Sequence, residues 1–235
     1  MTATSRSLAL CVAICGLWPR VADAAGRPVT VRTPDGRAVN ALLTEARDRN
    51  APGVVLVPML GRPKEDWNSV ADRLAEAGIH ALAIDLPSPT LPGDGSLAGW
   101  AQDVSAAVMY LVTRPEGRTT AVGLLGASLG ANLAVVAAAG DGHVQSLALL
   151  SPTLDYRGVR IEALFRQYGV RPALLVASLG DPYAARSVRA LVGESVTTHE
   201  VQWSEAVAHG TLLLNADPTV SGRLVDWFRR TLGLN

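Results

Sequence analysis

Three residues of this 235-residue chain have the types and the order that nucleophilic catalysis requires: Ser128, Asp181 and His209. A serine hydroxyl becomes a strong nucleophile when a histidine removes its proton, and a carboxylate can hold that histidine in the required tautomer. Each residue comes after an apolar run that is typical of a buried strand. If these strands share one sheet, the three side chains can meet at its edge and carry out acyl transfer.

The serine stands in the pattern G-x-S-x-G, which spans Gly126 to Gly130. A strand-like run, Val122–Leu125, precedes the pattern, and a helix-like run, Leu129–Ala139, follows it. We expect a nucleophile elbow, in which the two glycines leave room where strand and helix cross and the serine adopts a positive φ. The same letters also fit an ordinary glycine-rich connection between a strand and a helix, so the partners of the serine decide.

Asp181 follows the apolar run Ala173–Ala177, which places a carboxylate at the expected carboxyl end of a strand. In open sheets that alternate with helices, this edge is where ligand sites form. An aspartate followed by a proline, here Pro182, is also a favourable pair for starting a helix, so capping is an alternative role. Asp155, which follows the preceding strand, is the alternate candidate for the acid.

His209 comes after the last predicted strand, Val196–Val201, and before the closing helix. The other three histidines, His80, His143 and His199, lie in predicted strands or next to them. Histidines in such places usually have structural or surface roles. His209 is therefore the candidate general base.

The sequence has an elbow serine, then an aspartate, then a histidine, which is the chain order found in the α/β-hydrolase superfamily. It resembles this superfamily over nearly the whole chain after residue 25. The resemblance implies one domain over residues 26–235, with a mostly parallel twisted sheet of about eight strands, an antiparallel N-terminal hairpin and helices on both faces. Only about 22 residues separate the runs at 144–150 and 173–177, where members often insert a lid, so we expect little or no cap.

The resemblance also implies an oxyanion hole built from two backbone N–H groups. One comes from Leu129, directly after the nucleophile, and the other from the loop after the strand at 53–57, where we nominate Met59 with Leu60 in reserve. Many relatives carry His-Gly at the start of this loop, whereas Pro58 and Met59 stand here, so the second donor is assigned by position alone.

The predicted function is hydrolysis of a small carboxylic ester by Ser128, His209 and Asp181 through an acyl-enzyme, without a cofactor or metal. The layout is similar to the dienelactone-hydrolase-like and carboxylesterase branch, but dienelactone hydrolases proper use a cysteine nucleophile, so their substrate does not carry over. A thioesterase or peptidase on the same residues, and a non-catalytic binding protein of this fold, are the alternatives. A dinucleotide-binding glycine loop is disfavoured because Ser151, not an acid, ends the next strand.

The remaining patterns predict the other elements that must position the site. A hairpin over Pro28–Glu45 turns at Pro34-Asp35-Gly36, and Asp85 is expected to hold a loop at the end of a strand. The loop from Pro87 to Gly95 is expected to border the site. Further strands are expected at 53–57, 79–84, 144–150 and 173–177, and helices at 66–77, 96–113, 159–168 and 217–232.

The amino-acid composition limits the kinds of binding partner and substrate that the chain is expected to have. Hydrophobic residues make up 49% of the chain, which excludes a disordered protein. The 21 basic and 21 acidic residues balance and form no long runs, so neither a nucleic-acid surface nor a polybasic membrane patch is indicated. We expect a small-molecule substrate of the ester type, and the sequence does not indicate an oligomeric state.

The N-terminus reads as an export signal over residues 1–25. Arg6 provides a positive charge, Leu8–Leu17 is apolar but too short to span a bilayer, and Ala22-Asp23-Ala24 is a typical cleavage site. We expect a periplasmic or secreted protein. Both cysteines, Cys11 and Cys15, lie in this segment, so the mature chain would have no disulfide. A lipid anchor at Cys15 is a minority alternative, because Ile14 is larger than the residue such signals usually carry there.

Overall fold

The computed structural model describes residues 26–87, 97–119, 121–193 and 199–234. The predicted export signal, with both cysteines, lies outside these residues, as does most of the loop predicted over Pro87–Gly95. None of the helices in the described ranges is long and apolar enough to cross a membrane.

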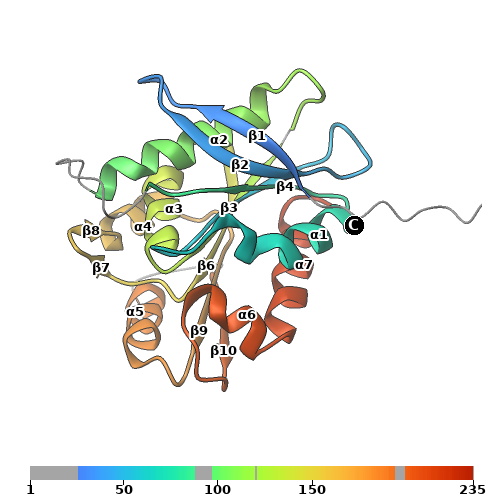
Figure 1. The fold of residues 1–235 in the computed structure, drawn as a ribbon. Helices are drawn as coiled ribbons and strands as arrows, with labels where there is room; N and C mark the ends of the chain where they lie inside the picture. Colours follow the sequence, from blue (N-terminus) through green and yellow to red (C-terminus); the bar gives the residue numbers. More distant parts are fainter. Residues whose placement is uncertain (1–25, 88–96, 120, 194–198, 235) are drawn as a thin grey trace, which may run out of the picture.

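A single eight-stranded sheet organises the described part of the chain (Figure 1). Its strand order is β1-β2-β4-β3-β5-β6-β9-β10, and all neighbours are parallel except β1 with β2 and β2 with β4. The strands are β1 (Arg27–Arg32), β2 (Ala38–Thr44), β3 (Gly53–Val57), β4 (His80–Ile84), β5 (Val122–Ala127), β6 (Val144–Leu150), β9 (Ala173–Ser178) and β10 (His199–Ser204). The predicted sheet and N-terminal hairpin are confirmed.

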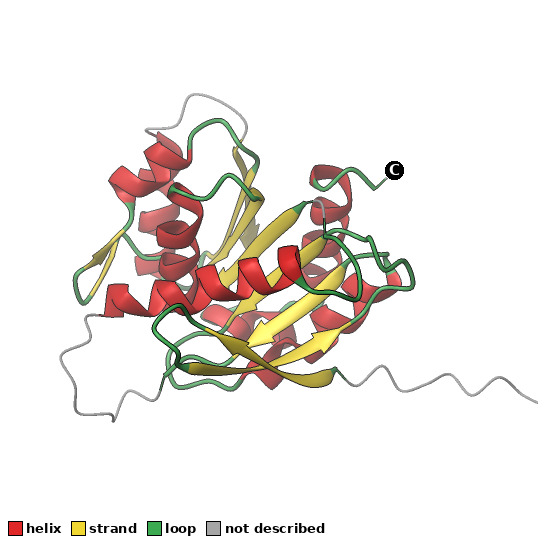
Figure 2. Cartoon of the chain, turned by 90° about the horizontal axis from the view of Figure 1, so that it is seen from above, coloured by secondary structure: helices red, strands yellow, loops and turns green. Residues whose placement is uncertain are grey.

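Helices cover both faces of the sheet, as the views in Figures 1 and 2 show. The helices are α1 (Asn68–Glu76), α2 (Ala101–Thr113), α3 (Leu129–Ala139), α4 (Glu162–Tyr168), α5 (Pro182–Gly193), α6 (Leu213–Ala216) and α7 (Thr219–Thr231). Buried residues of α2, α3, α4 and α5 form one apolar cluster, and those of α1, α6 and α7 form the other. Alternate residues of β3 divide between the two clusters, because successive strand side chains point to opposite faces. Such two-sided burial explains why the central strands read as continuous apolar runs.

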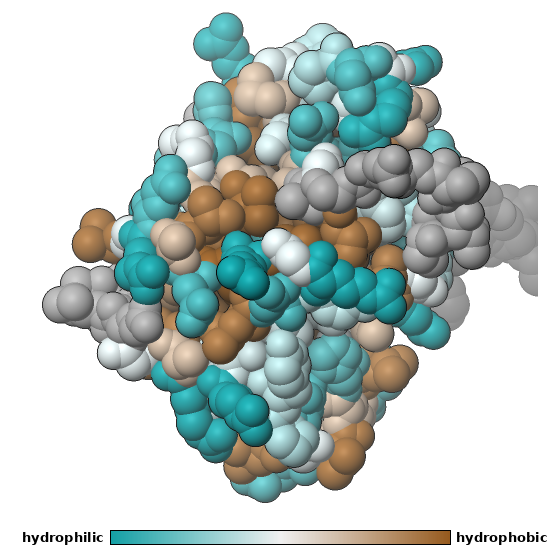
Figure 3. Space-filling view, turned by 90° about the vertical axis from the view of Figure 1, so that its left-hand side faces the viewer, coloured by the Kyte–Doolittle hydropathy of each residue, from teal (hydrophilic) through white to brown (hydrophobic). Residues whose placement is uncertain are grey.

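The segment between β6 and β9 holds a small hairpin, β7 (Asp155–Tyr156) with β8 (Val159–Arg160), followed by α4. It packs beside α3, where the buried amide of Asn132 donates to the Val159 carbonyl at 2.9 Å and accepts from the Thr153 N–H at 3.1 Å. This side of the molecule faces the viewer in Figure 3, with hydrophobic residues gathered near the centre of the face and hydrophilic ones around them. The segment is too short to form more than a small cap, as predicted.

Several element boundaries differ from the sequence prediction. The helices expected at 66–77 and 96–113 begin with the 3₁₀ turns η1 (Lys64–Trp67) and η2 (Leu97–Trp100). The helix expected from residue 159 begins at Glu162, because Gly158 at φ 91° turns the chain into the β7–β8 hairpin first. The last strand continues to Ser204 instead of ending at Val201, and part of its predicted start lies outside the described residues.

Candidate active site

Ser128 stands at the sharp turn between β5 and α3 with φ 51° and ψ −119°. A Cβ on Gly126 would lie 2.2 Å from the Gly130 carbonyl oxygen, and a Cβ on Gly130 would lie 2.4 Å from the carbonyl oxygens of Val57 and Pro58. Such distances are far inside van der Waals contact, so both positions require glycine. The geometry is that of the predicted elbow, and it presents Ser128 at the carboxyl edge of the parallel strands.

The structure brings the three predicted side chains together. The Nε2 atom of His209 lies 2.8 Å from the Ser128 hydroxyl oxygen, and its Nδ1 atom lies 2.5 Å from a carboxylate oxygen of Asp181. We refer to these contacts as the Ser128–His209–Asp181 hydrogen-bond chain. A carboxylate at Nδ1 favours the tautomer with the proton on that nitrogen, which leaves Nε2 to accept a hydrogen bond from the Ser128 hydroxyl.

The carboxylate of Asp181 contacts both the His209 ring and the first turn of α5. Its Oδ2 atom faces His209, whereas its Oδ1 atom accepts the Ala184 N–H of α5 at 3.2 Å. The N-terminus of α5 also stabilises a negative charge at this place through its aligned peptide dipoles. Capping and contact with the histidine are therefore complementary, because each uses a different carboxylate oxygen.

The C-terminal side of the loop that carries His209 is hydrogen-bonded to Asp66. Thr211 donates from its hydroxyl to Asp66 at 2.8 Å, and Asp66 also accepts two hydrogen bonds from Arg62 at 2.7 and 2.9 Å. Burial alone would raise the pKa of Asp66, but the bonds from Arg62 and Thr211 hold that pKa below its usual range. Asp66 therefore stays charged and joins the loop after β3 to the loop of His209.

One nominated backbone donor, Leu129, belongs to the elbow, and the other, Met59, lies in the loop after β3. Leu129 is the first residue of α3, so its N–H has no acceptor one turn earlier in the helix. Met59 follows Pro58, whose carbonyl oxygen would lie 2.4 Å from a Cβ on Gly130. The loop after β3 therefore runs directly beside the elbow. The Met59 sulfur packs over Gly210, at 2.7 Å from where a Cβ would stand. Leu60, the reserve donor, is partly buried against the core.

The site is partly open. The Ser128 residue is 6% exposed, and the side chains of Asp181 and His209 are 15% and 36% exposed. The imidazole is therefore accessible from outside, whereas the carboxylate behind it is largely covered. Ser128 is also largely covered, so the His209 ring is the most exposed part of the three residues.

The other candidate residues lie elsewhere. Asp155, the alternate acid, belongs to the β7–β8 hairpin, where its carboxylate binds Arg160 and the Gly158 N–H. His143 is exposed and bonds to Asp141, 2.8 Å away. His80 and His199 begin β4 and β10, at the opposite ends of these strands from the elbow.

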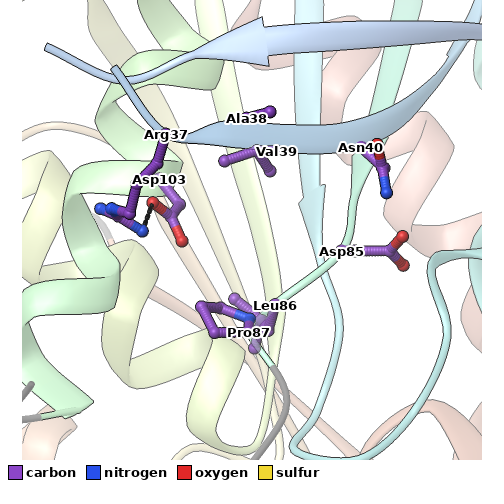
Figure 4. Close-up of a pocket in the computed structure, with 8 residues that line it drawn as sticks. All are labelled: Arg37, Ala38, Val39, Asn40, Asp85, Leu86, Pro87 and Asp103. Atoms are coloured by element: carbon purple, nitrogen blue, oxygen red, sulfur yellow. Dashed lines mark ion pairs between the residues drawn. The ribbon is translucent and has the colours of Figure 1, made fainter. Parts of the chain in front are cut away.

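Asp85 holds a loop, in agreement with the sequence prediction. Its carboxylate lies 2.8 Å from the Lys64 ammonium, which fixes the end of β4 to the turn that precedes α1. Figure 4 shows Asp85 at one side of a pocket of about 320 Å³, with the ion pair of Arg37 and Asp103 at the other. Neither carboxylate contacts His209, so this pocket is separate from the hydrogen-bond chain described above.

Two contributors were not identified from the sequence. Asp66 was expected only as the start of a helix, and Ser151 only as the residue after β6, yet both contact the loop of His209. Ser151 could have been suspected because it ends a strand at the same sheet edge as Ser128. No local pattern distinguishes Asp66.

The chain resembles solved structures but no protein-family model and no curated protein sequence. A dienelactone hydrolase from Anabaena variabilis is 20% identical with a TM-score of 0.74, and the match covers 88% of this chain and 97% of that one. An esterase from Pyrococcus furiosus is 15% identical with a TM-score of 0.73 over 88% and 92% of the chains. The esterase domain of a Rhodothermus marinus protein is 20% identical with a TM-score of 0.70 over 88% and 99%.

Proposed function

This chain has the α/β-hydrolase fold, and we propose that it is a serine hydrolase that cleaves small carboxylic esters through an acyl-enzyme. The observation that carries the proposal is the continuous Ser128–His209–Asp181 hydrogen-bond chain. Structures of similar fold that are named as esterases and a dienelactone hydrolase support the choice of reaction class.

In the first half of the reaction, Nε2 of His209 takes the hydroxyl proton of Ser128 while the serine oxygen bonds to the ester carbonyl carbon. Asp181 stabilises the positive charge that develops on the ring. The carbon–oxygen bond of the ester then breaks, and the alcohol leaves with the proton from His209. The acyl group remains on Ser128.

In the second half, water attacks the acyl-enzyme and gives one proton to His209. The bond between Ser128 and the acyl carbon breaks, the serine regains its proton, and the carboxylic acid is released. The backbone N–H groups of Leu129 and Met59 are proposed to stabilise the oxyanion in both halves. One such donor contributes about 3 kcal/mol of transition-state stabilisation in well-studied cases.

The test is hydrolysis of p-nitrophenyl acetate and butyrate by the purified protein and by Ser128→Ala. We expect turnover by the wild type and a loss of about 10⁴-fold or more in kcat for the variant. Ser146→Ala is the matched control, because this buried serine of β6 has a hydroxyl without a hydrogen-bond partner among the described residues. Turnover that survives in Ser128→Ala would refute the nucleophile, and a wild type that cleaves only thioesters or peptides would reassign the substrate.

We also propose that the chain is exported to the periplasm or secreted, with cleavage after Ala24 or Ala25. The proposal stands on the charge of Arg6, the apolar run Leu8–Leu17 and the cleavage pattern that ends at Ala24. Intact mass of the protein recovered from cell fractions tests it. A shortened chain outside the cytoplasm is expected, a full-length chain in the cytoplasm would contradict export, and a lipid-modified chain would favour anchoring at Cys15.

A further inference from the structure

Ser151 combines three features that are unusual for a serine directly after a strand. It follows β6 and is completely buried, its backbone has φ 51°, and its hydroxyl oxygen accepts the N–H of Gly210 at 3.0 Å. Gly210 is the residue after His209 and itself has φ 57°. The hydroxyl of Ser151 therefore holds the backbone next to the imidazole.

The positive φ of Ser151 is unfavourable for a serine. A positive φ is disfavoured for residues with a Cβ and costs on the order of 1 to 3 kcal/mol, whereas glycine adopts it without strain. If this position had only to turn the chain, glycine would serve it better. The feature that serine provides and glycine lacks is the hydroxyl, and that hydroxyl contacts the loop of His209.

The end of β6 also holds the nucleophile. The Leu150 carbonyl, one residue before Ser151, accepts the N–H of Ser128 at 2.9 Å. Ser151 is itself tied to the sheet through its N–H, which donates to the Val176 carbonyl at 2.7 Å. One rigid strand end therefore binds the backbone of the elbow through Leu150 and the backbone of the histidine loop through Ser151.

We propose that Ser151 is a positioning residue that sets the His209 imidazole at the correct distance from the Ser128 hydroxyl. The proposal rests on the proposed hydrolase function. Without the Ser151 hydroxyl, the Gly210 N–H loses its acceptor, and the loop can shift relative to the elbow. Proton transfer depends on this alignment, because a misplacement of about 1 Å can cost on the order of 100-fold in rate.

The test compares Ser151→Ala and Ser151→Gly with the wild type and with Ser146→Ala. Ser146 is a buried serine in the same strand, and within the described residues its hydroxyl has no hydrogen-bond partner. We expect kcat for p-nitrophenyl acetate to fall by roughly 10- to 100-fold in both Ser151 variants, with KM unchanged. Ser151→Gly should melt at a higher temperature than Ser151→Ala, because glycine relieves the strain at positive φ. A common loss of rate despite different stabilities would separate positioning from general folding.

Amide hydrogen exchange gives a readout that does not depend on activity. Exchange of the Gly210 N–H should become faster in both Ser151 variants and stay unchanged in Ser146→Ala. If the wild type hydrolyses esters but Ser151→Gly keeps the wild-type kcat, the positioning role is wrong while the hydrolase function stands. If the wild type shows no hydrolysis that depends on Ser128, the proposed function and the positioning role fail together.

Discussion

Two histidines at opposite edges of the same sheet have contrasting surroundings. His209 lies at the carboxyl edge of the parallel strands, with a carboxylate at Nδ1, a serine hydroxyl at Nε2 and a side chain that is 36% exposed. His80 begins β4 at the other edge and is completely buried. Its Nδ1 atom accepts the Ala46 N–H at 3.0 Å, and its Nε2 atom lies 2.9 Å from the Arg114 guanidinium.

The difference shows how neighbours decide what a histidine can do. His209 lies between a carboxylate and a serine hydroxyl, which is the arrangement that the proposed general base requires. Burial first, and then the positive charge of Arg114, lower the pKa of His80. His80 is therefore held neutral and serves the structure, as a member of a network that includes Arg114 and Glu45, 3.0 Å apart.

Removing each ring in turn should have the largest effect. His209→Gln should lower kcat for p-nitrophenyl acetate by about 10⁴-fold or more, because the serine loses its base. His80→Asn keeps an acceptor for the Ala46 N–H and should leave the rate unchanged. Steady-state kinetics on folded samples, checked by circular dichroism, measure both. Equal losses in the two variants would show that the edges do not differ in function.

The second prediction concerns the carboxylate that distinguishes the two rings. Asp181→Asn should lower kcat by about 10³- to 10⁴-fold, because an amide cannot hold the charged ring and favours the wrong tautomer. It should keep the cap on α5, whereas Asp181→Ala should also lose about 1 kcal/mol of unfolding free energy. Chemical denaturation with kinetics on the same samples separates the two roles. Full activity in Asp181→Asn would remove the aspartate from the mechanism.

Local sequence patterns predict most of the candidate site at the carboxyl edge of the sheet. The elbow, the strand before it and the helix after it are encoded within one continuous stretch, because crossing strand and helix demand glycine at Gly126 and Gly130. An apolar run likewise predicts the end of β9 before Asp181, whereas the strand before the loop of His209 ends at Ser204 and not at the predicted Val201. Such features depend on residues near each other in the chain, which is why patterns detect them.

The supporting contacts could not be predicted in this way. The hydrogen bonds that Gly210 donates to Ser151 and Thr211 donates to Asp66 join residues that are 59 and 145 positions apart. The pairing of His80 with Arg114 likewise depends on how α2 packs beside β4. The late end of β10 has a related cause, because parallel pairing with β9 carries the strand through Gln202 and Trp203 to Ser204.

The third prediction concerns the tight crossing of β5 and α3 at the elbow. Gly126→Ala should lower the unfolding free energy by about 1 to 3 kcal/mol or prevent folding, because the new Cβ meets backbone atoms of the elbow. Gly222→Ala in α7 is the matched control, since a Cβ there meets nothing within 4 Å. It should raise stability by about 0.5 to 1 kcal/mol, because alanine favours the helix. Urea denaturation measures both, and a Gly126→Ala protein of normal stability would contradict the tight crossing.

The smallest predicted effect is the pH dependence of stability at the other edge. The pKa of His80 is lower in the folded chain than its ordinary value of 6.5, so the unfolded chain binds a proton that the folded chain resists. The contribution of His80 to the unfolding free energy is therefore greatest above pH 6.5, and it falls as the pH drops below this value. Burial lowers the pKa of His199 in the same direction.

Thermal melts between pH 7.5 and 5 measure this effect. The melting temperature should decrease on acidification, and the decrease should be smaller in His80→Asn, with the remainder including the part due to His199. A variant whose melting temperature follows the wild type at every pH would show that His80 does not resist protonation. The pKa of His80 would then not be lowered by its surroundings.

The proposed function requires that His209 activates Ser128 at the carboxyl edge of the sheet. The most direct measurement is reaction of the purified protein with a fluorophosphonate, followed by proteolysis and mass spectrometry of the peptides. We predict a single adduct on Ser128, strongly reduced in His209→Gln and unchanged in His80→Asn. An adduct on another residue, or undiminished labelling of Ser128 in His209→Gln, would contradict it.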